Sequence, residues 1–357
     1  MKKILFAMFA VAALASCAQD EIVGKYNQEA IGFGNAFVDN ATKAIDPSYS
    51  ASNLLKKIYV YGTVTGTSNT PVSIFTHEEV WNDAEAEADI YNKLWQCRKT
   101  QYWVAGADYK FAAVAGIDQG KVTAVNGIPT EFDFTSNGET DLVYGYLERE
   151  DVGATGNAMV AFTMSHLLSK VKFTVTNTTN QGTSHDSGYY YKVTGIKFTN
   201  AYTAGDYTIS NTKTTVDGKD VWTVGGTWVT KGNAGEIAFG NATNSTSDPA
   251  AEAIADRDVV TSNYERLVVP CDYRTDKLNV NLTLALYLGD DAHCVNTDNK
   301  NIEVPVNLEP GKAYNFNINV SVGQPIQFTV TTNPTWANGN TVDGNDTDTE
   351  PDHIPAN

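Results

Sequence analysis

One stretch near the middle of the chain, residues 159–177 (MVAFTMSHLLSKVKFTVTN), constrains the fold more than any other. Its apolar residues alternate with small or polar ones in two runs, Val160, Phe162 and Met164, then Val171, Phe173 and Val175. A period of two is typical of strands that bury one face. Because residues 166–169 interrupt the period, we predict a kink there or a crossing between sheets, with one β-sandwich before the stretch and another after it.

Composition agrees with an all-β chain of two domains. The chain has 357 residues, enough for two sizeable cores, and only 19% of them are charged, while Thr, Asn, Gly and Tyr are abundant. This mixture suits half-exposed antiparallel strands joined by turns. The net charge of -17 argues against nucleic acids and anionic lipid surfaces as partners, because binding phosphate requires clustered Lys and Arg.

The N-terminus carries an export signal. Lys2 and Lys3 precede an apolar segment, residues 4–14, that is too short to span a bilayer as a mature anchor. Residues 14–17 (LASC) then look like a bacterial lipobox, which predicts cleavage before Cys17 and a lipid on its thiol. Three acyl chains would anchor the protein stably, whereas one chain binds only marginally. The alternative is an ordinary secretory peptide with an incidental cysteine.

The remaining cysteines leave their pairing open. Cys97, Cys271 and Cys294 are odd in number once Cys17 is set aside, so at least one stays free or pairs with another chain. Cys271 and Cys294 could form a disulfide in an oxidising compartment. The sequence has no CxxC spacing, so we expect no zinc site, and no other metal or cofactor is predicted.

Alternating apolar segments predict strands along most of the chain, among them residues 31–38, 54–64, 189–198, 278–288 and 313–322. One segment, residues 76–93, has helical spacing and is rich in Glu and Ala. Residues 230–262 are rich in Asn, Ser, Ala and Asp, which predicts a long loop. A further alternating strand, residues 326–331, follows the break at Pro325, and the polar residues beyond Trp336 are predicted not to pack.

An ordered set of motifs resembles the fimbrillin family of Bacteroidetes, the type V pilins and their fimbrillin-like lipoprotein relatives. In chain order the motifs are the lipobox at Cys17, Tyr102-Trp103 with residues 109–113 (YKFAA), residues 141–144 (DLVY), residues 165–173 (SHLLSKVKF) and residues 308–314 (LEPGKAY). Together they cover nearly the whole mature chain. The resemblance implies an outer-membrane lipoprotein on the cell surface, within a fimbrium.

The resemblance also implies two tandem transthyretin-like β-sandwich domains and assembly by strand exchange. A trypsin-like protease cuts the loop after the first strand, that strand leaves, and the C-terminal strand of another subunit replaces it. Here the cut is expected between Lys43 and Ala44, although Arg is usual in place of Lys43, and the donor strand would present Ile326, Phe328 and Val330. The alternative is that this last strand stays in its own subunit.

These considerations divide the chain as follows: a signal peptide (1–16), a lipidated pro-segment with the first strand (17–43), an N-terminal sandwich (44–178), a C-terminal sandwich (179–322), a candidate donor strand (323–333) and a polar tail (334–357). The predicted function is a structural fimbrial subunit that supports adhesion. Its predicted partners are other fimbrial subunits, the maturation protease and, through the lipid, the outer membrane.

Two other classes of function fit the sequence less well. A surface lipoprotein that binds glycans or host ligands without polymerising could use Trp222, Trp228 or the tyrosines at 189–191, although such rings more often pack in or beside a core. An enzyme is not expected, because the sequence has no GxSxG, HExxH or phosphate-binding glycine motif. His166, between the two runs of the central stretch, is expected to be structural.

Overall fold

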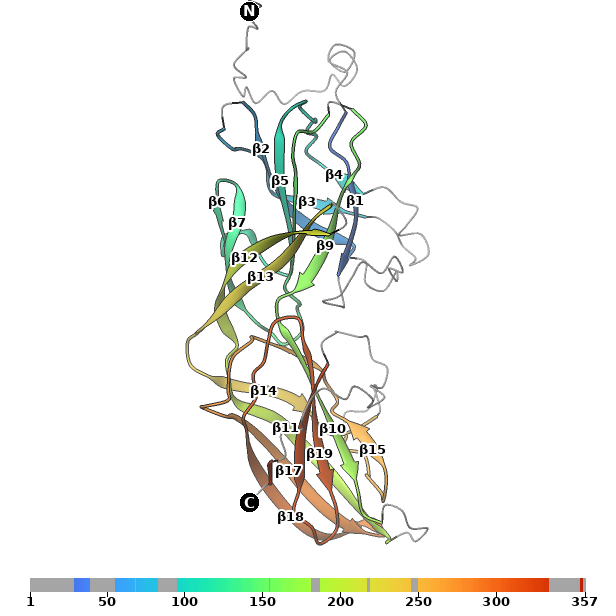
Figure 1. The fold of residues 1–357 in the computed structure, drawn as a ribbon. Helices are drawn as coiled ribbons and strands as arrows, with labels where there is room; N and C mark the ends of the chain where they lie inside the picture. The colour runs from blue at the N-terminus through green and yellow to red at the C-terminus, as the bar shows by residue number, and fades with distance from the viewer. Residues whose placement is uncertain are drawn as a thin grey trace, which may run out of the picture.

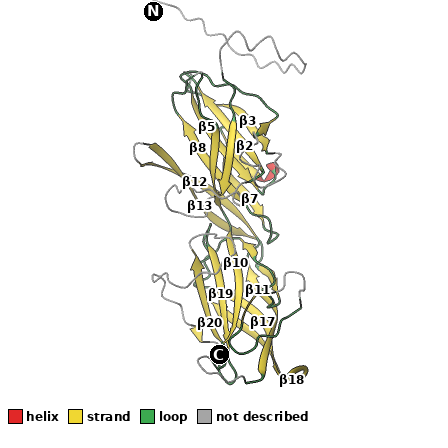
Figure 2. Ribbon diagram, turned by 90° about the vertical axis from the view of Figure 1, so that its right-hand side faces the viewer, coloured by secondary structure: helices red, strands yellow, loops and turns green. Residues whose placement is uncertain are grey.

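The computed structural model describes residues 29–38, 55–67, 69–82, 95–153, 155–180, 187–216, 219–244, 250–333 and 354–355. Within these ranges the chain is all-β, as predicted, apart from one turn of 3-10 helix, η4 (Gln119–Lys121). Two units of packed sheets lie end to end (Figure 1). Figure 2 shows the same two units from the side.

The first unit contains two sheets. The larger has the order β1-β9-β8-β5-β2-β3-β4, formed by β1 (Phe33–Val38), β2 (Lys57–Thr65), β3 (Val72–Trp81), β4 (Gln96–Cys97), β5 (Asp108–Ala115), β8 (Val143–Arg149) and β9 (Val160–His166). The smaller has the order β13-β12-β7-β6, formed by β6 (Val122–Val125), β7 (Ile128–Thr135), β12 (Ala204–Val216) and β13 (Lys219–Lys231). The larger sheet is buried on both faces: Phe111 of β5 packs into one core, and the neighbouring Ala112 packs into the other.

The second unit also contains two sheets. One has the order β15-β10-β19-β20-β21, with β16 also on β10, and consists of β10 (Ser169–Asn177), β15 (Val259–Thr261), β16 (Arg266–Val268), β19 (Ala313–Val320), β20 (Gln327–Asn333) and β21 (Ile354–Pro355). The other has the order β14-β11-β17-β18, formed by β11 (Tyr189–Ala201), β14 (Gly235–Gly240), β17 (Leu278–Leu288) and β18 (Asp290–Val304). Phe173, Phe198, Phe239 and Phe316 meet between them, with ring centroids 4.8–5.7 Å apart.

The central stretch crosses between the two units, as its interrupted period predicted. β9 lies in the larger sheet of the first unit, and β10 pairs in parallel with β19 in the second. Leu167 and Leu168, which join β9 to β10, are buried. The Leu167 amide donates to the Leu142 carbonyl (2.9 Å), and the Gly311 amide donates to the Leu168 carbonyl (2.9 Å). The crossing is therefore hydrogen-bonded to both units.

The predicted domain ranges 44–178 and 179–322 do not coincide with the units that strand pairing defines. β10 lies before residue 178 but belongs to the second unit. The hairpin β12–β13 lies after it but pairs with β7 of the first unit, with Asp206 opposite Asp133. Alternation reveals which face of a strand is buried but not which strand lies beside it, so the sequence could not place this hairpin.

Two local predictions were wrong. The first part of the predicted helix, residues 76–81, belongs to β3, where Val80 pairs with Ile58 and is fully buried; residues 83–94 lie outside the described ranges. Pairing with β2 outweighs local helical spacing there. The predicted loop 230–262 contains β14 and β15, because Ile237 and Phe239 alternate inward to join the second core.

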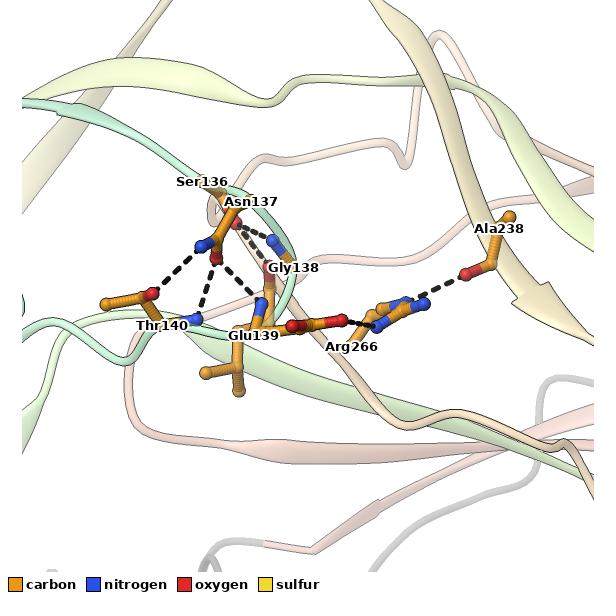
Figure 3. Close-up of polar contacts among 8 residues, drawn as sticks. Ser136, Asn137, Gly138, Glu139, Thr140, Ala238 and Arg266 are labelled. Atoms are coloured by element: carbon orange, nitrogen blue, oxygen red, sulfur yellow. Dashed lines mark hydrogen bonds and ion pairs between the residues drawn. The ribbon is translucent and has the colours of Figure 1, made fainter. Parts of the chain in front are cut away.

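A polar joint also connects the two units (Figure 3). Ser136, just after β7, donates its hydroxyl to the Leu267 carbonyl (2.7 Å), and the Leu267 amide donates to the Gly138 carbonyl (2.9 Å). Arg266 of β16 forms an ion pair with Glu139 at 2.9 Å. Its Nε also donates to the Ala238 carbonyl (2.9 Å), so one side chain connects the loop of the first unit to β14 of the second.

We predict that Gly138→Ala weakens this joint. Gly138 has a φ of 80°, in the left-handed region, and a Cβ there would lie 3.0 Å from Cδ of Arg266. The expected loss in free energy of unfolding is about 1–3 kcal/mol, measured by urea denaturation. Gly66→Ala is the matched control, since a Cβ there meets nothing within 4 Å, and it should be neutral or stabilising by up to about 1 kcal/mol. Equal stabilities for the two variants would contradict the strained joint.

Candidate functional site

β1 lies at one edge of the larger sheet of the first unit, parallel to β9 (Figure 1). Phe33 is opposite Val160, and the Val160 amide donates to the Gly32 carbonyl at 2.8 Å. The other pairings that join the described strands of this sheet are antiparallel. Within this sheet β1 therefore has one strand neighbour, β9, and its parallel pairing differs from the antiparallel pairing of the other strands.

The side of β1 away from β9 is also hydrogen-bonded. The Ile31 amide donates to the Gln101 carbonyl (2.7 Å), and the Trp103 amide donates to the Glu29 carbonyl (3.0 Å). Further along, the Leu55 amide donates to the Ala36 carbonyl (3.1 Å). We call the surface formed by β9, residues 101–103 and Leu55 the β1 site. Residues 29–36 thus bond to protein on both sides, as a central strand does.

Apolar side chains of residues 29–36 pack into the first core at the β1 site. Ile31 and Phe33 are buried, and the Phe33 ring meets the Phe75 ring edge to face with centroids 5.3 Å apart. The register shifts between Phe33 and Ala36, and the buried Ala36 has the opposite parity from Phe33. The alternating pattern does not indicate this bulge, because alternation cannot show where a register shifts.

Arg149 of β8 supports the start of β9. Its Nη2 donates to the Met159 carbonyl (2.7 Å), and its guanidinium lies 5.6 Å from the centroid of the Trp103 ring. Burial lowers the pKa of Arg149, yet a guanidinium stays protonated in proteins. A fixed cation therefore ties the two sides of the β1 site together, through Met159 next to β9 and Trp103 opposite.

The predicted lipidation residue, Cys17, and the predicted cleavage residues, Lys43 and Ala44, lie outside the described residues. Their order relative to the β1 site follows from the chain. Cys17 precedes β1, and Lys43 follows Val38, the last residue of β1, by five positions. A cut after Lys43 would therefore leave β1 without a covalent bond to the rest of the fold.

The C-terminal strand, predicted as the donor, is paired within its own chain in this structure. β20 runs antiparallel to β19, with Phe328 opposite Ile318 and Val330 opposite Phe316. Ile326 and Phe328 are buried in the second core, and Val330 packs against it partly exposed. This arrangement is the alternative that the sequence left open, and the donor role stays a proposal.

The disulfide considered between Cys271 and Cys294 is not formed, and the thiols of Cys97, Cys271 and Cys294 are free. The Leu308 amide bonds to the Cys271 carbonyl, which places Cys271 near the end of β18 at Val304. Cys294 pairs with Tyr287, nine positions along β17 from Leu278, the partner of Val304. At about 3.4 Å per residue, Leu278 and Tyr287 are about 30 Å apart, and the two cysteines beside them are separated by a similar distance. A disulfide needs Cα atoms within about 7 Å.

The aromatic residues considered for glycan binding are engaged in packing. Trp228 donates its indole N–H to the Leu167 carbonyl (2.8 Å) and packs against the core of the first unit. Trp222 meets Tyr146 edge to face at 4.9 Å, and Tyr191 is buried in the second core. Tyr190 stacks on Tyr287 at 5.2 Å. Packing, the reading that the sequence favoured, accounts for these rings.

Among the described residues, no group of three or more His, Cys, Asp or Glu could hold a metal ion. Within the same ranges, no helix has the length and apolar character needed to cross a membrane. His166 Nδ1 lies 2.5 Å from Asp141 Oδ2, beside the crossing between the units. This pairing agrees with the structural role expected for His166.

Comparison with known proteins identifies similar chains. The family model described as fimbrillin-like matches residues 42–336. A fimbrial protein from Bacteroides vulgatus ATCC 8482 has 15% sequence identity and a TM-score of 0.51, over 86% of this chain and 99% of that chain. At this identity the similarity shows a shared fold.

A protein from Bacteroides ovatus ATCC 8483, described as a candidate cell adhesion protein, has 14% identity and a TM-score of 0.47, over 86% of this chain and 96% of that chain. No curated protein sequence matches this chain.

We predict that Phe33→Ala loosens β1 selectively. The substitution removes the ring that packs on Phe75, at a cost of about 3 kcal/mol, and an edge strand can detach without unfolding the sheet. Amide hydrogen exchange of residues 29–38 should accelerate roughly 100-fold, while β19 exchanges at its former rate. Val72→Ala, at a position 56% exposed, is the control and should change neither rate. Unchanged exchange in residues 29–38 of the Phe33→Ala protein would show that the ring does not hold β1.

Proposed function

The chain belongs to the fimbrillin-like family, and we propose that it is a structural subunit of a cell-surface fimbria that supports adhesion. In this proposal it is exported as a lipoprotein through Cys17 and anchored in the outer membrane. It polymerises after a trypsin-like protease cuts behind Lys43, when a strand from another fimbrial subunit replaces β1. Family membership also supports the prediction that the chain is not an enzyme.

The observation that carries the proposal is that residues 29–36 are hydrogen-bonded to the rest of the first unit on both sides. Residues 29–36 bond to β9 on one side and to residues 101–103 and Leu55 on the other. Within this segment the side chains of Ile31 and Phe33 are buried. Loss of β1 would leave unpaired backbone groups along β9 and open an apolar floor. Such an edge binds another strand by main-chain hydrogen bonds, and side-chain pockets give specificity.

The connection through Lys43 explains how a cut would start the exchange. While the chain is intact, the tether holds β1 near its site at an effective concentration on the order of millimolar. After a cut, the released segment competes at its free concentration, which is far lower in dilute solution. A strand from another subunit can then compete for the site at a comparable concentration, and the strand that binds more tightly occupies it. The lipid on Cys17 would remain with the released segment, freeing the mature chain from its own anchor.

We predict that brief trypsin digestion of soluble protein starting at Ala18 cuts after Lys43 and yields oligomers. The new N-terminus, Ala44, is mapped by mass spectrometry, and unboiled samples on a denaturing gel should show a ladder that boiling abolishes. Lys43→Gln is the control, and it should stay monomeric. A clean cut with monomer alone would contradict self-sufficient polymerisation, and resistance at Lys43 would contradict the proposed maturation site.

We predict that Cys17→Ser abolishes lipidation. Cells that express the intact gene product with labelled palmitate should incorporate label into the wild-type protein and not into the variant. The wild-type protein should fractionate with outer membranes. Cys97→Ser, which removes a thiol that packs beside the first core, is the control and should keep the label. Equal labelling of wild type and Cys17→Ser would place the lipid on another residue, and absence of label from both would identify residues 1–16 as an ordinary secretory peptide.

A further inference from the structure

β10 and β19 form the longer of the two parallel pairings among the described strands. β1 and β9 pair over four positions with a register shift, whereas β10 and β19 pair over eight without one, from Lys170 opposite Ala313 to Asn177 opposite Val320. β10 begins at the crossing from the first unit, so both strands start at that end of the sheet and finish at the far end (Figure 1). We call this pairing the β10–β19 ladder.

Backbone hydrogen bonds extend the β10–β19 ladder at both ends. At the end near the first unit, the Gly311 amide donates to the Leu168 carbonyl (2.9 Å). At the far end, the Thr178 amide donates to the Val320 carbonyl (2.7 Å). The two strands are therefore connected from the crossing to the last residue of β19.

Side chains join the same two strands on both faces of the sheet. On the inner face, Phe173 lies opposite Phe316, both are fully buried, and their ring centroids are 5.1 Å apart. On the outer face, the Thr174 hydroxyl donates to Oδ1 of Asn315 (2.9 Å). Sliding one strand along the other would therefore break contacts on both faces as well as the backbone bonds.

We propose that the β10–β19 ladder is a mechanical clamp, a pairing that resists tension applied along the subunit. The inference rests on the proposed function, because a fimbria that supports adhesion is pulled along its length and transmits the tension from subunit to subunit. It adds a function that assembly alone does not require, since the chain must also stay folded while it is pulled.

Tension enters the β10–β19 ladder at opposite ends. Tension from the first unit reaches β10 through Ser169, which follows the crossing. Tension on the chain after β19 reaches this strand at Val320, its last residue. Because the strands are parallel, the two forces act in opposite directions along them and shear the ladder. The bonds lie across the strands, so shear loads them together, whereas pulling both strands from the same end would break them one after another.

Within the part of the chain that the structure describes, no other strand lies between β10 and β19. β15 and β16 pair with the other side of β10, and β20 pairs with the other side of β19. The second sheet of this unit, which contains β11 and β17, contacts these strands through the core. The β10–β19 ladder is therefore the most direct mechanical connection between the first unit and the end of β19.

Pulling the same fold in two directions tests the clamp. In the Thr163→Cys, Gln324→Cys protein, DNA handles attach to β9 before the crossing and to the turn after β19, so tension shears the ladder. In the control, Thr176→Cys with Gln324→Cys, both handles attach at the far end of the ladder, so tension unzips it. The three side chains are exposed or partly exposed. So that only the handles react, both proteins start at Ala18 and carry Cys97→Ser, Cys271→Ser and Cys294→Ser.

Optical tweezers should record a several-fold higher unfolding force for the sheared protein than for the unzipped control at the same loading rate. Forced unfolding is governed by the unfolding rate, so the comparison reports the barrier in each direction. Equal forces in the two directions would overturn the clamp. Stepwise extension of residues 163–324 at low force would overturn it as well, because a clamp yields in one step.

Two matched threonine substitutions locate the resistance. Thr174→Val removes the hydroxyl that bonds to Asn315 within the ladder. Thr283→Val removes the same kind of bond, from the Thr283 hydroxyl to Oδ1 of Asn299 (2.7 Å), between β17 and β18. Val suits a strand, so both variants should fold and should lose similar stability in urea. Only Thr174→Val should lower the force in the sheared direction. An equal effect of both would assign the resistance to the whole second unit and would overturn the ladder as its source.

The outcomes separate this inference from the proposed function, because the pulling measurements use uncut monomers. If trypsin yields no oligomers but the sheared protein resists, strand exchange fails and the clamp stands. If oligomers form but the two directions unfold at equal force, the clamp fails and strand exchange stands.

Discussion

The continuous backbone from β9 through Leu167 and Leu168 into β10 is the constraint on which the rest of the structure depends. One strand carries β1 on its edge, and the next pairs with β19 at the centre of the second unit. The crossing between them is hydrogen-bonded to Leu142 on one side and Gly311 on the other. Together with the Arg266–Glu139 ion pair, it couples the β1 site of one unit to the sheet that holds the C-terminal strand in the other.

Several features of the β1 site suit the proposed replacement of its strand. Its pairing is two-sided, which gives an incoming strand many hydrogen bonds, yet β1 enters parallel to β9 and with a register shift. Parallel pairing is slightly weaker per residue than antiparallel pairing, and a bulge leaves a residue out of the ladder. The covalent tether through Lys43 compensates for this while it is intact. A cut behind Lys43 would remove this tether and leave β1 held by its hydrogen bonds and by the packing of Ile31 and Phe33.

The sequence predicted the all-β class, a kink or a crossing at residues 166–169, the first strand and the last strand, because alternation over many residues reports one buried face. It failed where pairing partners decide the outcome. Residues 76–81 have helical spacing but pair with β2. The hairpin β12–β13 pairs with β7 of the first unit, although β10 and β11, which precede it, belong to the second. The far side of the β1 site, residues 101–103, includes the motif Tyr102-Trp103, but only the fold shows that it bonds to Ile31 and Glu29. The bulge after Phe33 has no signature in the alternating pattern.

The central claim is that another strand replaces β1 once the chain is cut. Native mass spectrometry of the cut protein tests it most directly, because each species is weighed with its bound fragments. The account predicts oligomers built from chains that begin at Ala44 and lack the segment 18–43, which is recovered free. Oligomers that retain this segment in equal number with the chains would show that β1 never leaves its site, and they would contradict strand exchange.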